Sequence, residues 1–268
     1  MSRIEERFAA LKKENRKALV TYIVNGDPSL TATLPTMHAL VEGGADIIEL
    51  GVPFSDPMAD GGAIQLGHQR ALENKASLRS SLAVVEEFRK SNKDVPVVLM
   101  GYENPIERMG YETFAAEAER VGVDGVIIVD LPPEEGAALK QALADRSLNM
   151  IYLVAPSTTE ERAKKIIACA SGFLYYVSVK GVTGSSTLDT DDVNDKLNAL
   201  RELTDLPICV GFGIKTGDSA RAVTQISDGA VVGSLFVDAM GQRASKADDE
   251  IAAAVKELVA PIRAAIDS

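Results

Sequence analysis

Apolar, β-branched-rich runs alternate with amphipathic segments along the whole chain. The apolar runs predict β-strands that begin about 30 residues apart, which is the length of one strand with its following helix. Apolar residues are nearly continuous within them, as is typical of parallel strands covered by helices. The expected strands are Ala18–Val24, Asp46–Leu50, Val95–Gly101, Asp124–Val129, Asn149–Val154, Gly172–Ser178, Pro207–Gly211 and Gly229–Gly233.

The amphipathic segments predict helices between these strands, with a further helix at Arg3–Lys13 and a last one at Asp249–Ile266. The helices in between include Thr31–Glu42, Leu78–Lys90, Glu112–Val121, Glu134–Arg146 and Thr159–Ala170. Eight strand-then-helix units favour an α/β fold, a single (β/α)8 TIM barrel with an extra N-terminal helix, in one domain over residues 1–268. A doubly wound open sheet is the alternative, but no Gly-x-Gly-x-x-Gly follows the first strand.

Charge and composition narrow the classes of partner. The chain carries 28 Lys and Arg against 39 Asp and Glu, a net charge of −11, which disfavours binding to nucleic acid or anionic membranes. No apolar run is long enough to span a membrane and no signal peptide is recognised, so we expect a cytoplasmic protein. Two cysteines and two histidines leave little material for a disulfide framework or a metal site.

The two longest loops follow the second and sixth strands, at Gly51–Ser77 and Val179–Asp191. In a barrel, the loops after the strands carry the chemistry. Glu49, between Ile48 and Leu50 at the end of the second strand, would be costly to bury unless it is paired or functional. Burial would raise its pKa and suit it to proton exchange near neutral pH, whereas an outward orientation would pair it with a helix Lys or Arg.

The loop after the second strand contains two prolines, two aspartates and several glycines. Asp60 could accept a hydrogen bond from a substrate N–H, or it could cap a helix at Ala63–Leu72. Asp56, which precedes Pro57, is interpreted as a turn residue.

Glycine-rich turns follow three strands in the second half of the chain. Backbone N–H groups in such turns, with a helix N-terminus after the eighth strand, predict a phosphate site, although glycine turns are also common as helix caps. Lys180 could form an imine with a carbonyl substrate or be a solvated loop residue. The turns are 180–186, 211–215 and Gly233-Ser234.

The remaining candidates have a plain structural interpretation. Cys209 falls in a buried strand, Cys169 in a helix, and His68 on a polar helix face. Five residues near strand ends could line an apolar pocket or merely complete the core: Tyr22, Met100, Ile127, Tyr175 and Phe212.

Taken together, these motifs resemble the tryptophan synthase alpha chain family. The segment Glu49-Leu-Gly-Val-Pro-Phe-Ser-Asp-Pro-Met-Ala-Asp60-Gly resembles its most specific signature. The resemblance covers essentially the whole chain in the right order, with departures at Gly62, Ala63 and Glu103 beside the expected site. The other matching segments are Gly26-Asp-Pro, MGYENP from Met100, GVDG from Gly122, DLP from Asp130, GVTG from Gly181 and GFGI from Gly211.

The resemblance implies a lyase that cleaves indole-3-glycerol phosphate into indole and glyceraldehyde 3-phosphate. It implies Glu49 as the proton shuttle and Asp60 as the partner of the indole N–H. It implies phosphate binding by Gly184, Gly213, Gly233 and Ser234. It implies an indole pocket of Tyr22, Met100, Ile127, Tyr175 and Phe212.

The resemblance also implies a beta-chain partner in an αββα heterotetramer. Pyridoxal phosphate is then expected in the beta chain, with no cofactor in this one. We further expect residues 180–189 to form a lid in which Thr183 bonds Asp60. Three other functions stay open: a Schiff-base aldolase using Lys180, a catalytically idle activator of the beta chain, and a phosphosugar isomerase or epimerase.

Overall fold

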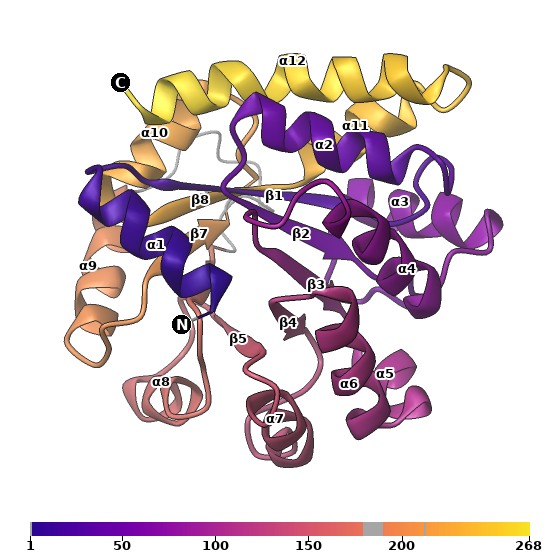
Figure 1. The fold of residues 1–268 in the computed structure, drawn as a ribbon. Coiled ribbons are helices and arrows are strands. Elements are labelled where there is room, and N and C mark those ends of the chain that lie inside the picture. The colour runs from indigo at the N-terminus through magenta and orange to yellow at the C-terminus, as the bar shows by residue number, and fades with distance from the viewer. Residues whose placement is uncertain (1, 179–189, 212) are drawn as a thin grey trace.

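Eight parallel strands close into a barrel in chain order, so that β8 pairs with β1 and the sheet has no free edge (Figure 1). The computed structural model describes residues 2–178, 190–211 and 213–268. The expected (β/α)8 fold class is confirmed. The strands are β1 Ala18–Val24, β2 Ile47–Gly51, β3 Val97–Gly101, β4 Gly125–Ile128, β5 Asn149–Val154, β6 Leu174–Val177, β7 Ile208–Gly211 and β8 Gly229–Val232.

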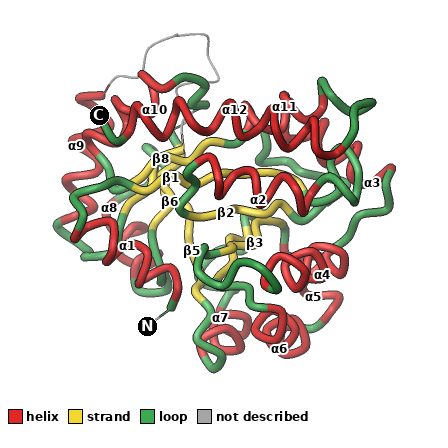
Figure 2. Tube along the Cα trace, turned by 45° about the horizontal axis from the view of Figure 1, so that its top comes forward, coloured by secondary structure: helices red, strands yellow, loops and turns green. Residues whose placement is uncertain are grey.

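Helices surround this barrel, and Figure 2 shows the strands enclosed by them, with α12 running along α2. A short helix over Glu103–Met109 was not predicted, because Pro105 lies within it. Proline is tolerated there because the first helical turn has no intrahelical N–H bond to lose. The helices are α1 Arg3–Lys13, α2 Thr33–Gly43, α3 Gly62–Glu73, α4 Leu78–Arg89, α5 Glu103–Met109, α6 Tyr111–Val121, α7 Ala137–Ala144, α8 Glu160–Ile167, α9 Thr190–Arg201, α10 Gly217–Ile226, α11 Ser234–Gly241 and α12 Asp248–Ile266.

The core has two layers, one inside the barrel and one between the strands and the helices. In β1 all seven residues are buried, with Leu19 and Ile23 in the outer layer and Ala18 and Val20 inside the barrel. Burial on both faces accounts for the nearly continuous apolar runs in the sequence.

Helix α1 covers the end of the barrel at which the strands begin (Figure 1). Its Ile4, Phe8 and Leu11 recur at helical spacing and pack into the interior cluster, where the Phe8 ring lies 5.8 Å from that of Phe173. One end of the barrel is therefore sealed by apolar packing, and a ligand has to enter at the other.

Two carboxylates at the sealed end explain why β2 and β4 begin one residue later than predicted. Asp46 Oδ2 accepts the N–H of Leu19 at 2.8 Å, and Asp124 Oδ2 accepts the N–H of Val97 at 2.7 Å. Just before its own strand begins, each carboxylate thus accepts a backbone N–H of the neighbouring strand, in place of a backbone carbonyl group. Each is also paired with a mostly buried arginine, in the pairs Asp46–Arg263 and Asp124–Arg89.

Candidate active site

A cavity of about 330 Å³ opens at the end of the barrel where the strands finish. Because all strands run parallel, their carboxyl ends meet there, and residues far apart in the sequence share one wall. Eight of the predicted site residues line it: Tyr22, Glu49, Asp60, Met100, Tyr175, Gly213, Gly233 and Ser234.

Of the other predicted site residues, only Ile127 lies among the described residues, and it is not part of this wall. Ile127 is fully buried in the barrel interior, where it packs beneath the cavity, and the neighbouring wall is instead formed by Val129 and Leu153. The reason is that Val129 lies two residues further along, toward the carboxyl end of β4. Thr183, Gly184, Phe212 and the alternative nucleophile Lys180 lie outside the described residues.

Glu49 is completely buried and lines the cavity from β2, in register with Tyr22 on β1. Neither carboxyl oxygen has a hydrogen-bond partner among the described residues. The loss of hydration raises the pKa of Glu49 to about 8. The outward orientation that the sequence left open is therefore wrong, and at neutral pH the side chain is an acid that holds a proton.

Asp60 is held differently, in the loop between β2 and α3. Its Oδ2 accepts a hydrogen bond from the Tyr102 hydroxyl at 2.8 Å, and that hydroxyl accepts the N–H of Ala59 at 3.1 Å. The N-cap residue of helix α3 is Gly61, and no side chain there accepts a hydrogen bond from the first helical N–H groups. The interpretation of Asp60 as a helix cap is therefore wrong. Tyr102 was not predicted as a site residue, although it belongs to the MGYENP segment.

His68 is the clearest residue that the sequence interpretation missed. Its side chain is 2% exposed, and its Nε2 lies 3.5 Å from Asp60 Oδ2 and 3.4 Å from the Tyr22 hydroxyl. Ile64 and Ala71 lie four residues before and three residues after it on α3, so helical periodicity places all three on the inward face. That spacing was the available signal, and the polar residues next to His68 obscured it.

Two glycines make room for two tyrosines at the cavity floor. A Cβ at Gly51 would lie 2.3 Å from the Tyr22 hydroxyl oxygen, and one at Gly211 would lie 2.3 Å from that of Tyr175. Burial raises the pKa of both tyrosines well above the ordinary value, so each remains a hydroxyl donor.

Another part of the cavity wall offers backbone groups rather than charged side chains. Gly233 caps the N-terminus of α11, and Ser234 is the first residue of that helix. Gly213 has φ +49°, and a Cβ there would meet no described atom within 4 Å. Ser178 Oγ, also on this wall, is buried without a hydrogen-bond partner among the described residues. A helix N-terminus beside free backbone and hydroxyl donors is suited to a phosphate group.

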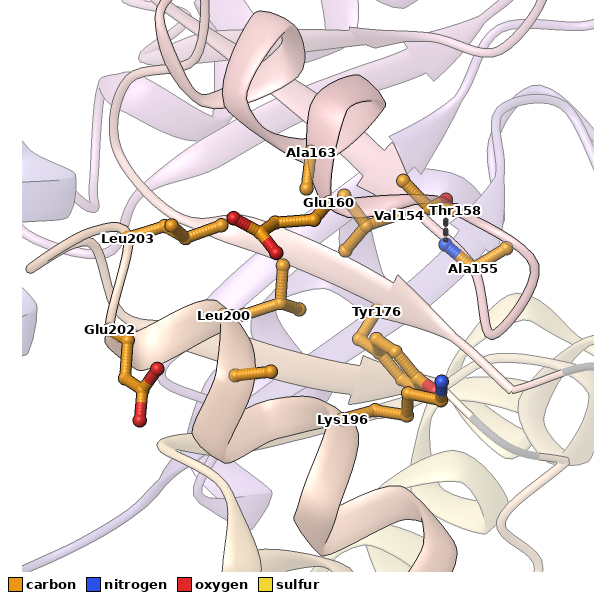
Figure 3. Close-up of a pocket in the computed structure, with 11 residues that line it drawn as sticks. Val154, Ala155, Thr158, Glu160, Ala163, Tyr176, Lys196, Leu200, Glu202 and Leu203 are labelled. Carbon is orange, nitrogen blue, oxygen red and sulfur yellow. Dashed lines mark hydrogen bonds between the residues drawn. The ribbon is translucent and has the colours of Figure 1, made fainter.

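A second cavity of about 220 Å³ lies outside the barrel, between α8 and α9 (Figure 3). Figure 3 shows Glu160, Lys196 and Glu202 around it, with Tyr176 at its floor. Glu160 is exposed and paired with Lys164, and burial raises the pKa of Tyr176 to about 12. This cavity lacks the buried acid that the barrel cavity has, so we assign the chemistry to the barrel.

Among the described residues, no helix is long and apolar enough to cross a bilayer. Within the same residues, no group of three or more His, Cys, Asp or Glu side chains is arranged to hold a metal ion.

Comparison with known proteins relates this fold and site to one family. Residues 8–266 match the family model of the tryptophan synthase alpha chain. The tryptophan synthase alpha chain of Marinobacter nauticus is 54% identical over 100% of this chain and 99% of its own length.

Solved structures agree. The tryptophan synthase subunit alpha of Legionella pneumophila superposes with a TM-score of 0.91 at 40% identity, covering 100% of this chain and 99% of that one. A chain of Mycobacterium tuberculosis tryptophan synthase in an aminoacrylate-bound form superposes with a TM-score of 0.88 at 32% identity, covering 99% and 100%.

The contact between Gly51 and Tyr22 generates a stability prediction. Replacing Gly51 by Ala forces a methyl group into the Tyr22 ring, and overpacking of this kind costs about 1–3 kcal/mol. Gly62→Ala is the matched control, because its Cβ meets nothing within 4 Å and alanine is favoured in a helix. Urea unfolding should give a lower midpoint for Gly51→Ala only. Equal midpoints for the two variants would refute this packing.

Proposed function

Because this chain belongs to the tryptophan synthase alpha chain family, a lyase subunit of tryptophan biosynthesis, we propose that its barrel cavity cleaves indole-3-glycerol phosphate to indole and glyceraldehyde 3-phosphate. The observation that carries the proposal is the buried Glu49, to which none of the described residues donates a hydrogen bond, in the same cavity as Asp60. Proton transfer at carbon requires such a poised acid.

Glu49 begins the reaction as the acid. It delivers its proton to C3 of the indole ring, which places positive charge on the ring and its nitrogen. The resulting carboxylate then removes the proton of the hydroxyl on the adjacent side-chain carbon. That carbon becomes the aldehyde as its bond to C3 breaks, and the bonding electrons restore the aromatic ring.

The net change moves one proton from oxygen to carbon, and Glu49 returns to its starting form. A pKa of about 8 suits a group that gives and regains a proton near neutral pH.

Asp60 supports this step from the ring nitrogen. A carboxylate that accepts the indole N–H stabilises the positive charge that develops when C3 is protonated. Tyr22, Met100 and Tyr175 line the same cavity and offer apolar and aromatic surface to the ring.

The phosphate anchors the substrate at the glycine-rich part of the wall. Gly213, Gly233 and Ser234 present backbone groups and the start of α11, and Ser178 adds a hydroxyl donor that was not predicted. Binding energy gained at this remote group can fix the reacting atoms beside Glu49.

We also propose that a beta chain docks on the loop after β2 and on α3. Met58 is 83% exposed, and Leu66 and Leu72 expose apolar surface on the adjoining helix. Exposed apolar side chains gathered in this way are typical of a protein interface. In the proposed αββα assembly, indole passes to the beta chain, which would hold pyridoxal phosphate, and we place the complex in the cytoplasm.

Competing functions make different predictions. A Schiff-base aldolase through Lys180 would be trapped covalently by borohydride in the presence of substrate. An idle activator would show no single-turnover cleavage as an isolated chain. A phosphosugar isomerase or epimerase would act on substrates without an indole ring.

The first test concerns the acid. Glu49→Gln keeps the shape but carries no transferable proton, so indole formation should fall by about 10²–10⁴-fold. In the unsubstituted chain, kcat/KM should fall as pH rises through about 8, because only the protonated acid can start the reaction. Indole release is the assay, and binding of an uncleavable indole alkyl phosphate is the control. Most activity remaining in Glu49→Gln would overturn the proposal.

The second test concerns the phosphate. Gly213→Val would place a branched side chain in the open space beside the backbone. Loss of one charge-assisted hydrogen bond costs about 1.5–3 kcal/mol, so affinity for an indole alkyl phosphate should fall about 10–100-fold. Affinity for indole itself, measured by calorimetry, should be retained. An equal loss for both ligands would point to misfolding instead.

The third test concerns the partner. Met58→Asp places a carboxylate in the proposed interface, where an unpaired charge is costly to bury. Affinity for the beta chain should fall by about tenfold or more, the effect expected of a central apolar contact. Ala9→Asp, exposed on α1 at the sealed end of the barrel, adds the same charge as a control. Equal affinity of the two variants, measured by sedimentation, would place the interface elsewhere.

A further inference from the structure

His68 touches both ends of the loop that carries Asp60. From α3, its ring reaches the backbone of Phe54 at the start of the loop and the carboxylate of Asp60 near its end. Phe54 N lies 3.2 Å from Nδ1, and Asp60 Oδ2 lies 3.5 Å from Nε2. One imidazole therefore joins two points of the chain that are six residues apart.

The hydrogen-bond network assigns the tautomer of this imidazole. A backbone N–H can only donate, so Nδ1 of His68 accepts from Phe54 and carries no proton. The ring proton of the neutral form is then on Nε2. Nε2 is hydrogen-bonded to the Tyr22 hydroxyl at 3.4 Å, and Asp60 Oδ2 lies 3.5 Å from the same nitrogen, within ion-pair distance.

The two oxygens of Asp60 differ as a result. Oδ2 receives the Tyr102 hydroxyl at 2.8 Å and faces the His68 N–H, whereas none of the described residues donates to Oδ1. The Phe54 and Tyr102 rings stack with their centroids 5.0 Å apart. This stacking joins Phe54, which donates to His68, to Tyr102, which donates to Asp60. The carboxylate is thus held through one oxygen, and the other is left for a ligand in the cavity.

We propose that His68 is a positioning residue that holds Asp60 through its Nε2–H, so that Oδ1 is directed to the N–H of the indole ring. This inference rests on the proposed function, because it takes the indole N–H as the partner of Asp60. His68 contacts neither the reacting carbon nor the phosphate wall in this account, and acts only through Asp60.

Two substitutions separate the two contacts of the ring. His68→Gln carries an N–H donor at the level of Nε2, whereas His68→Asn carries an acceptor at the level of Nδ1 and loses the reach to Asp60. Relative to the unsubstituted chain, His68→Leu should lower kcat/KM about tenfold or more, the effect of losing a hydrogen bond to a charged group. His68→Gln should recover most of that loss and His68→Asn little of it. Recovery by Asn alone would show that His68 acts through the Phe54 backbone, and would overturn the proposal.

A double-substitution cycle tests the route through Asp60. Affinity for an uncleavable indole alkyl phosphate should fall in His68→Leu, but His68→Leu should change nothing further in a chain that already carries Asp60→Asn. Additive losses would show that His68 acts independently of Asp60 and would contradict the proposal. Thermal unfolding of each variant separates this coupling from a general loss of structure.

A measurement that needs no activity keeps this inference separable from the proposed function. The chain has only two histidines, so imidazole ¹⁵N shifts are assigned by comparison with His38→Gln. His68 should show an unprotonated Nδ1 and a protonated Nε2. The opposite tautomer would overturn the inference even in an active enzyme. The expected tautomer in a chain that forms no indole would instead count against the proposed function.

Discussion

A single buried carboxyl group without a hydrogen-bond partner is the feature on which the site depends. Glu49 lies at the carboxyl end of β2, where apolar strand residues enclose it and none of the described residues donates to it. Ionising such a group costs several kcal/mol, so it keeps its proton to a much higher pH than an exposed glutamate. The acids at the sealed end of the barrel are treated differently, since Asp46 and Asp124 each accept a backbone N–H and pair with an arginine. The acids at the sealed end of the barrel are thus paired, whereas Glu49 at the open end has no partner among the described residues, as its proposed role requires.

The two acids of the cavity differ in their surroundings in a way that matches two roles. Glu49 accepts no hydrogen bond from any described residue, while Asp60 accepts one from Tyr102 and lies 3.5 Å from Nε2 of His68. Where two carboxyl groups lie in contrasting environments, one commonly acts as the acid and the other stabilises charge electrostatically. The residues proposed to bind the phosphate, Gly233 and Ser234 at the start of α11, come from other elements than the two acids, so substrate binding energy can be gained without altering either acid.

Much of the fold could be predicted from periodicity alone, because both faces of every strand are covered and apolar runs mark them plainly. The bounds of β1, β5 and α1 match the sequence interpretation, and β2 and β4 start later only because an aspartate side chain replaces a ladder partner. Tyr22, Met100 and Tyr175, which the sequence places near strand ends, line the cavity.

The clearest miss came from tertiary contacts that no local pattern encodes. His68 was placed on a polar face, and only the packing of α3 against the barrel turns it inward. Ile127 packs in the barrel interior together with Met100 and Tyr175, and its predicted contact with an indole ring remains a prediction. The predicted lid and the roles of Thr183, Gly184 and Phe212 remain predictions, since those residues lie outside the described ranges.

The protonation state of Glu49 is the most direct test of this account. Carboxyl ¹³C NMR of glutamate-labelled protein, compared with Glu49→Gln to identify the missing resonance, would follow this one group through a pH titration. The account predicts that the Glu49 signal is that of a protonated acid at pH 7 and titrates with an apparent pKa of about 8. A signal that titrates near the ordinary glutamate value of about 4.3 would contradict it, because Glu49 would then be a carboxylate at neutral pH with no proton to give.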